Sequence, residues 1–484
     1  TANITAKTLT ATASASNKVY DGNTTATVTL TFTGLVGDET LGQSVGATFA
    51  DKDVANAKTV TVNSITLSDD GDSGGLADNY SISTGQTTTA NITAKTLTAT
   101  ASASNKVYDG NTTATVTLTF TGLVGDETLG QSVGATFADK DVANAKTVTV
   151  NSITLSDDGD SGGLADNYSI STGQTTTANI TAKDLTITAN NGSATYGTAF
   201  TVGAGSENFT SSGLVNSETI GTITIASDDG ATNTSSVGTY NIVPSAATGG
   251  TFTASNYNIT YANGTLTVAA KDLTITANNG SATYGTAFTV GAGSENFTSS
   301  GLVNSETIGT ITIASDDGAT NTSSVGTYNI VPSAATGGTF TASNYNITYA
   351  NGTLTVAAKD LTITANNGSA TYGTAFTVGA GSENFTSSGL VNSETIGTIT
   401  IASDDGATNT SSVGTYNIVP SAATGGTFTA SNYNITYANG TLTVAAKDLT
   451  ITASASNKVY DGNTTATVTL TFTGLVGDET LRQS

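Results

Sequence analysis

The sequence predicts a mostly β protein: a tandem array of small β-rich domains, sandwich-like or β-grasp-like, that forms an elongated rod. Three observations predict this class. A motif returns every 88 residues along the 484-residue chain, as from Lys7 to Lys95. Within each period, apolar residues alternate with Thr. Where one period meets the next, no linker rich in Gly, Ser or Pro separates them.

The period defines two kinds of repeat. The motif Ala-Lys-[Thr/Asp]-Leu-Thr carries its lysine at Lys7, Lys95, Lys183, Lys271, Lys359 and Lys447. First-type repeats span 7–94 and 95–182, second-type repeats span 183–270, 271–358 and 359–446, a truncated first-type repeat spans 447–484, and 1–6 match the tail of a preceding repeat. We expect the chain to be an excerpt from a longer array. A repeat of this length can be an independent domain, unlike the shorter units of solenoids.

The strands follow from the period-2 pattern. In the first type we predict strands at 8–13, 25–33 and 58–67, and in the second type at 184–189 and 221–227. Around Asn263-Gly264, two alternating runs predict a hairpin with a two-residue turn. Apart from one short turn, no stretch has helical spacing.

The tripeptide Tyr20-Asp21-Gly22 returns in each first-type repeat. Comparison of the two types aligns Tyr20 with Tyr196 and Gly22 with Gly197, whereas Asp21 has no counterpart. The shared ring and glycine predict a structural turn whose Tyr packs into the core. The Gly-Leu-Val and Asn-Tyr-x-Ile segments that both types share are predicted to supply further core residues.

Composition narrows the function classes. The chain has no Cys and no His, which removes thiolate and histidine chemistry and common zinc sites. It has 14 basic and 37 acidic residues, a net charge of −23. This balance opposes binding to nucleic acid or anionic membranes, and no apolar run is long enough to span a bilayer. We therefore predict a protein that is not an enzyme, with no nucleic-acid partner and no membrane insertion in this segment.

The motifs resemble a known pair of domain families. KVYDGNTTATVTL with TGLVGDETL and NYSI resembles the YDG domain, and LTITANNGSATYGTAFT with NYNITYANGTLTV resembles the MBG domain. Both recur in large repetitive bacterial surface proteins, including adhesins of the filamentous-haemagglutinin kind. The resemblance covers essentially the whole chain. It implies a secreted, β-rich spacer array at the bacterial cell surface, and it carries over no catalytic residues.

The acidic segment 68–80 is the best candidate for a metal site. With Asp70 as the first position of a calcium loop, Asp72 takes the third, Gly75 the sixth and Asp78 the ninth, but Ser81 replaces the bidentate Glu of the twelfth. The equivalent residues of the next repeat are Asp158, Asp160 and Asp166. The alternative is a loop in which the carboxylates cap backbone amides. Calcium is the single cofactor that the sequence predicts.

Other chemistries have weaker support. Asp228-Asp229 forms a pair that suits a tight turn better than a glycosidase site. Thr-rich strands suit β-propensity better than ice binding. The single lysines of the second type, Lys183, Lys271 and Lys359, are candidates for isopeptide bonds to Asn, but their junction positions favour solvation. Asn-x-Ser/Thr sequons are expected by chance in this composition.

Taken together, these features predict a stalk or spacer of a secreted bacterial surface adhesin or extracellular fibre that supports attachment or matrix formation. In the alternative, the repeats themselves bind host or matrix glycans or neighbouring chains as adhesive modules, through exposed strand edges. Expected partners are other copies of the chain and neighbouring surface fibres.

Overall fold

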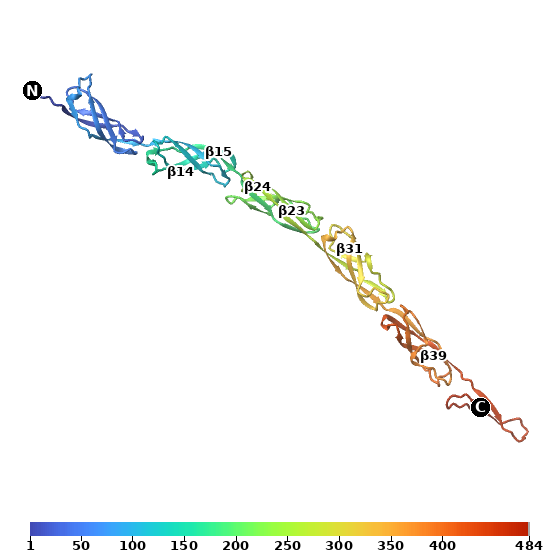
Figure 1. Cartoon of the computed structure of the whole chain (residues 1–484). Helices are drawn as coiled ribbons and strands as arrows, with labels where there is room; N and C mark the ends of the chain where they lie inside the picture. Colours follow the sequence, from blue (N-terminus) through green and yellow to red (C-terminus); the bar gives the residue numbers. More distant parts are fainter. Residues whose placement is uncertain (483–484) are drawn as a thin grey trace. The chain divides into compact units, whose positions relative to one another are not determined.

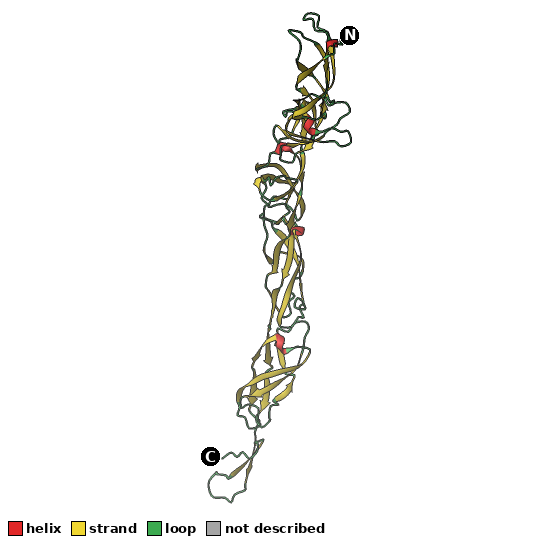
Figure 2. Ribbon diagram, turned by 90° about the vertical axis from the view of Figure 1, so that its left-hand side faces the viewer, coloured by secondary structure: helices red, strands yellow, loops and turns green. Residues whose placement is uncertain are grey.

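The computed structural model describes residues 1–482 and is built almost entirely of strands. Figure 2 shows the strands in yellow and the short 3-10 turns in red. None of the helices among these residues is long and apolar enough to cross a membrane. The mostly β prediction is confirmed.

The two complete first-type repeats contain equivalent strands. In 7–94 these are β1 (Lys7–Ala15), β2 (Lys18–Val19), β3 (Thr25–Ala26), β4 (Val28–Thr33), β5 (Gly42–Phe49), β6 (Ala55–Ser68), η1 (Ala77–Asn79), β7 (Tyr80–Ile82) and β8 (Thr87–Thr93). In 95–182 these are β9 (Lys95–Thr96), β10 (Thr98–Ala103), β11 (Lys106–Val107), β12 (Thr113–Ala114), β13 (Val116–Thr121), β14 (Gly130–Phe137), β15 (Ala143–Ser156), η2 (Ala165–Asn167), β16 (Tyr168–Ser169) and β17 (Thr175–Thr181).

The three second-type repeats repeat one set of elements. In 183–270 these are β18 (Lys183–Ala189), β19 (Gly192–Thr195), β20 (Gly203–Ser206), β21 (Phe209–Ser212), β22 (Ile220–Ser227), β23 (Gly238–Gly250), η3 (Ala254–Asn256), β24 (Tyr257–Ala262) and β25 (Gly264–Ala269). In 271–358 these are β26 (Lys271–Ala277), β27 (Gly280–Thr283), β28 (Gly291–Ser294), β29 (Phe297–Ser300), β30 (Ile308–Ser315), β31 (Gly326–Gly338), η4 (Ala342–Asn344), β32 (Tyr345–Ala350) and β33 (Gly352–Ala357). In 359–446 these are β34 (Lys359–Ala365), β35 (Gly368–Thr371), β36 (Gly379–Ser382), β37 (Phe385–Ser388), β38 (Ile396–Ser403), β39 (Gly414–Gly426), η5 (Ala430–Asn432), β40 (Tyr433–Ala438) and β41 (Gly440–Ala445). The truncated repeat contributes β42 (Thr450–Ala455) and β43 (Val468–Thr473).

Each complete repeat is a sandwich of a five-stranded sheet and a smaller layer, which is one three-stranded sheet in four repeats and two separate ladders, β10-β13 and β16-β9, in the second repeat. In the first repeat a three-stranded sheet has the order β4-β1-β7 and a five-stranded sheet the order β2-β8-β6-β5-β3. The fourth repeat has the same pattern, β29-β26-β32 and β27-β33-β31-β30-β28. Long antiparallel neighbours such as β14 and β15 lie side by side in Figure 1. Of the two forms that the sequence left open, the structure is therefore the sandwich.

The chain enters and leaves each sandwich on parallel strands. The entering strand β1 pairs in parallel with β7, and its continuation β2 pairs in parallel with the last strand, β8. The first strand thus contributes to both sheets. The first residues of a repeat are therefore hydrogen-bonded to its last strands.

The core lies between the two sheets and explains the alternating sequence. Leu9, Leu30, Val60, Val62 and Ile92 are each at most 3% exposed. Along β4, the apolar residues face inward and each Thr between them is exposed. The strands predicted at 8–13, 25–33, 58–67, 184–189 and 221–227 all fall on strands of the structure.

The hairpin predicted around Asn263-Gly264 is wrong. β24 pairs with β18 in the three-stranded sheet, whereas β25 pairs with β19 in the five-stranded sheet. The segment is therefore a crossing between sheets. Gly264 is needed for close approach, because a Cβ there would lie 2.5 Å from the carbonyl oxygen of Ala189. Asn-Gly satisfies this tight crossing as well as it satisfies a hairpin turn.

Candidate functional site: the repeat junctions

The Tyr-Gly turn that both repeat types share lies at the contact with the following repeat. We call this turn the corner; in the first repeat it is Tyr20, Asp21 and Gly22. Gly22 has φ +82°, and a Cβ there would come within 2.6 Å of Val124 Cγ1 in the next repeat. Glycine is therefore required both by the backbone conformation and by the neighbouring repeat.

The next repeat receives the corner with a set of residues that we call the socket: Val124, Glu127, Asn167 and Tyr168 in the second repeat. The Tyr20 hydroxyl donates to Glu127 Oε1 at 2.6 Å, and the Tyr168 hydroxyl donates to the other carboxylate oxygen. The two rings meet edge to face, with centroids 5.4 Å apart. One carboxylate thus joins two tyrosines from consecutive repeats.

An asparagine adds a second attachment across the same junction. Val54 N of the first repeat donates to Asn167 Oδ1 at 2.8 Å, and Asn167 Nδ2 donates to Asp53 Oδ1 at 2.9 Å. Asn167 is 1% exposed, so its amide is buried with both of its groups hydrogen-bonded. The 3-10 turn η2 ends at this residue and places it next to Tyr168.

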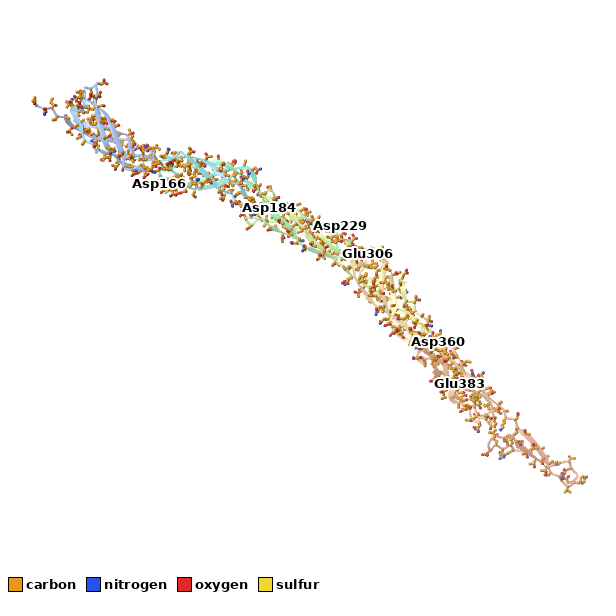
Figure 3. The ribbon with its side chains drawn as sticks, in the orientation of Figure 1. Asp166, Asp184, Asp229, Glu306, Asp360 and Glu383 are labelled. Atoms are coloured by element: carbon orange, nitrogen blue, oxygen red, sulfur yellow. The ribbon has the colours of Figure 1, made fainter. Side chains whose placement is uncertain are left out.

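The same contacts return at the later junctions. Tyr108 donates to Glu218, Tyr196 to Glu306, Tyr284 to Glu394 and Tyr372 to Glu479. The ring pairs at the second, third and fourth junctions also have centroids 5.4 Å apart. Val142, Val237 and Val325 donate their backbone N–H groups to Asn256, Asn344 and Asn432. Figure 3 labels Glu306, which belongs to the loop between β29 and β30.

All four possible orders of repeat types occur among these junctions. Tyr20 joins two first-type repeats, Tyr108 joins a first-type repeat to a second-type repeat, Tyr196 joins two second-type repeats, and Tyr372 joins a second-type repeat to the truncated first-type repeat. The socket accepts a corner of either type.

Burial and hydrogen bonding shift the pKa values at the junction. Burial, followed by the hydrogen bond to Glu127, raises the pKa of Tyr168 to about 12. Burial alone would raise the pKa of Glu127, but the hydrogen bonds from Tyr168 and Tyr20 and the charge of Lys52 lower it overall. Near neutral pH, the junction therefore contains a carboxylate held between two neutral phenols.

The predicted calcium residues lie in a loop of each first-type repeat. Asp70 accepts hydrogen bonds from the hydroxyl of Thr40 and from the backbone N–H of Asp72 (3.2 Å), and Asp78 lies in η1. The hydrogen bond from Thr40 lowers the pKa of Asp70. Asp158 makes the same contacts, to Thr128 and Asp160, in the second repeat.

Within residues 1–482, no group of three or more His, Cys, Asp or Glu residues is placed to hold a metal ion, and this includes Asp72, Asp78, Asp160 and Asp166. Figure 3 labels Asp166. The structure shows Asp70 and Asp158 capping turns, and calcium binding stays a prediction.

The sequence predicted the corner but missed the socket. Gly34-Leu35-Val36 and its counterparts were expected in the core, yet Val36 is 55% exposed and the equivalent Val124 contacts the preceding repeat. The sequence did contain a signal for the socket. Both repeat types place a Glu three residues after this Val, as in Val36 and Glu39, or Val215 and Glu218.

Comparisons with known proteins agree with the repeat organisation. The family model of the YDG domain matches residues 5–90 and 93–178, and that of the MBG domain (YGX type) matches 185–267, 273–355 and 361–443. No curated protein matches the sequence.

Two solved structures were found among the similar ones. The N-terminal eight Ig domains of Down syndrome cell adhesion molecule are 10% identical, over 96% of this chain and 75% of that chain, with a TM-score of 0.13. The Bacillus anthracis TIE protein is 7% identical, over 90% of this chain and 74% of that chain, with a TM-score of 0.17. TM-scores this low do not establish a common fold.

Proposed function

Because the chain belongs to the YDG domain and MBG domain families, we propose that it is a structural repeat array of a secreted bacterial surface adhesin or extracellular fibre. Its role is that of a stalk or spacer that supports attachment or matrix formation. The function is mechanical and requires no catalytic residue. The protein works outside the cell, at the bacterial surface.

The recurrence of one junction carries this proposal. A spacer must fix the orientation of each domain relative to the next, and short connections alone leave bending and twisting free. Here a ring pair, a shared carboxylate and a buried Asn amide oppose both motions at successive junctions. Such a chain stays stiff and keeps a distal part of the protein at a set distance from the cell.

Small-angle scattering on the full chain tests this role. The variant replaces the junction carboxylates, Glu127, Glu218, Glu306 and Glu394, by Ala, which removes the acceptor shared by both tyrosines. We expect a smaller radius of gyration and a scattering profile of a flexible chain, with unchanged far-UV circular dichroism. The matched control replaces Glu207, Glu295 and Glu383, which lie outside the junction contacts described above, and should scatter like the parent. Equal stiffness of the junction variant and the parent would exclude the stiff-spacer role.

The alternative, in which the repeats themselves are adhesive, has a separate readout. A spacer should give no signal on a glycan array or in a cell-adhesion assay with this chain. Specific retention would favour repeats that bind glycans.

A further inference from the structure

The amino-acid composition makes tyrosine the most easily oxidised side chain of this protein. Cys, Met and Trp, which compete with tyrosine for oxidants, are all absent, whereas the chain has 17 Tyr. A one-electron oxidation of the folded chain therefore produces a tyrosyl radical. The surroundings of each tyrosine then decide what this radical reacts with.

Each junction described above holds two tyrosines from consecutive repeats against each other. The rings of Tyr20 and Tyr168 have centroids 5.4 Å apart and planes at 80°. Both hydroxyls donate to the carboxylate of Glu127, so the hydroxyl ends of the two rings meet at one group. Tyrosyl radicals couple through the ring carbons next to the carbon that bears the hydroxyl, and these carbons belong to the same end of each ring. The pair therefore brings together the parts of the rings that a dityrosine bond joins.

The same arrangement returns at the later junctions. The ring centroids are again 5.4 Å apart, with planes at 79–82°, in the pairs Tyr108–Tyr257, Tyr196–Tyr345 and Tyr284–Tyr433. In each pair both hydroxyls donate to one carboxylate, that of Glu218, Glu306 or Glu394. All Tyr–Tyr ring contacts found within residues 1–482 are of this kind.

The carboxylate supplies what the oxidation of a neutral phenol requires. Burial, followed by the hydrogen bond to Glu218, raises the pKa of Tyr257 to about 12, so this phenol is protonated near neutral pH. Its oxidation must release a proton together with the electron. Tyr257 already donates to Glu218, and Tyr108 donates to the same carboxylate at 2.7 Å, a distance that permits direct proton transfer. The junction thus contains the acceptor for the proton of either phenol.

Burial also selects the partner of the radical. Tyr20 is 1% exposed and Tyr168 is 5% exposed, so a ring of a second chain cannot reach either of them. The ring already in contact belongs to the next repeat of the same chain. Because the two reactants are held together, coupling does not depend on the encounter of two molecules.

We propose that the junction tyrosine pairs are sites of oxidative cross-linking, at which a peroxide-derived oxidant joins consecutive repeats by a dityrosine bond. Each phenol of a pair loses one electron to the oxidant and one proton to the carboxylate, which passes it to water. The two radicals form one carbon–carbon bond between ring carbons next to the hydroxyls. The hydrogen atoms on these two carbons then move to the oxygens and restore both hydroxyls. For each bond, one molecule of hydrogen peroxide takes up two electrons and two protons and leaves as two molecules of water.

Photo-oxidation of the full chain tests the bond. A ruthenium tris-bipyridyl complex with persulfate, which is itself a peroxide, supplies one-electron oxidation under light. At low protein concentration we expect dityrosine fluorescence and a mass loss of two hydrogen atoms for each bond. We also expect faster migration in a denaturing gel, because a bond within one chain makes the unfolded chain more compact.

Conservative variants assign the signal to the junctions. The test variant keeps every ring and removes one phenol of each pair: Tyr168→Phe, Tyr257→Phe, Tyr345→Phe and Tyr433→Phe. It should lose the fluorescence and the fast-migrating band. The matched control removes phenols that donate to backbone carbonyls of their own repeat, Tyr240→Phe, Tyr328→Phe and Tyr416→Phe, and should give the yield of the parent.

Digestion after lysine locates the bond. Tyr108 lies in the peptide 107–140 and Tyr257 in the peptide 184–271, and a linked product of these two sequences identifies the second junction. Fragment spectra should place the bond on Tyr257 and not on Tyr240 or Tyr261 of the same peptide. Bonds on those two tyrosines, bands of linked chains alone, or equal yields from the test variant and the parent would each overturn the proposal. The stiffness test uses the chain before oxidation, so the spacer role and the cross-link fail separately.

Discussion

The two repeat types build the same junction with different supporting side chains. In the first type, Lys52 donates to the hydroxyl of Tyr20 at 2.8 Å and its Nζ lies 5.2 Å from the centre of the ring. In the second type, two amides take this role, since Asn233 Nδ2 donates to Asn304 Oδ1 at 2.9 Å and Asn304 Nδ2 donates back to the Asn233 carbonyl at 3.0 Å. The ring centroids are nevertheless 5.4 Å apart in both. The phenol pair and its carboxylate are the common requirement, and the polar surroundings can change.

The two repeat types also differ in the length of the parallel pairing between their entering and leaving strands. In the first repeat the parallel pairing covers three residue pairs between β1 and β7 and two between β2 and β8. In the fourth repeat it covers six pairs between β26 and β32 and four between β27 and β33. Ion pairs show the opposite trend, because every one found among residues 1–482 lies in a first-type repeat. First-type repeats use charge at their surface, and second-type repeats use a longer backbone ladder.

We expect the largest effect on stability from removing the ring of a corner tyrosine, and this effect should be equal in both repeat types. Tyr20→Ala and Tyr284→Ala each remove a side chain that is at most 5% exposed and leave a cavity at the junction. We expect each to lower the free energy of unfolding of the affected repeat by about 3–5 kcal/mol. Urea unfolding followed by far-UV circular dichroism should show an additional early transition. Tyr460→Ala is the control and should leave the curve unchanged, because Tyr460 is exposed. A much smaller loss in one type would show that the ring is not the common requirement.

A mechanical measurement should separate the two types. Force applied to the chain ends pulls the parallel entering and leaving strands past each other, so their hydrogen bonds are loaded together. Second-type repeats have about twice as many such pairs as first-type repeats. In single-molecule stretching of the full chain we expect two unfolding events at lower force and three at higher force. Ala282→Pro, placed in β27 on the same side as Tyr284, whose N–H donates to the Ala357 carbonyl, removes a donor from this ladder and should move one event from the high-force group to the low-force group. Five events at one force would contradict the role of the ladder.

The sequence was sufficient to predict the repeats, the mostly β class and the strands with strict alternation, and it left the choice between a sandwich and a β-grasp form to the structure. In β4, Thr alternates with Val and Leu, so that one face of the strand meets water and the other meets the core. This alternation allows only one interpretation. The sequence was not sufficient for strands whose pattern is interrupted. β23 contains Pro244 and has a shifted register against β22, with Ala246 at φ +48°. A bulge of this kind breaks the period on which the prediction depends.

The junction was harder to predict, because the residue types buried inside a repeat are the same as those buried between two repeats. Tyr20 was expected to be buried beside a glycine turn, and it is. Its hydroxyl and its ring, however, contact Glu127 and Tyr168 of the next repeat, and Glu127 lies 107 residues later in the chain. The periodic pattern describes each strand locally and does not say which repeat supplies the partner of a buried residue.

The smallest expected effect concerns alkaline pH, and it tests the part of the junction that both types share. Burial and the hydrogen bond to a carboxylate raise the pKa of Tyr168 and of Tyr345 from 10.0 to about 12. Because the folded-state pKa is the higher one, the stabilisation is complete below pH 10 and is lost as the pH rises toward 12. Tyr168→Phe and Tyr345→Phe remove the ionising group, so stability should fall less steeply over this range in each variant than in the parent. Thermal unfolding at a series of pH values, together with the tyrosinate absorbance, measures both quantities. A variant whose alkaline loss equals that of the parent would show that this tyrosine does not govern the junction, and unequal results for the two variants would assign the dependence to one repeat type.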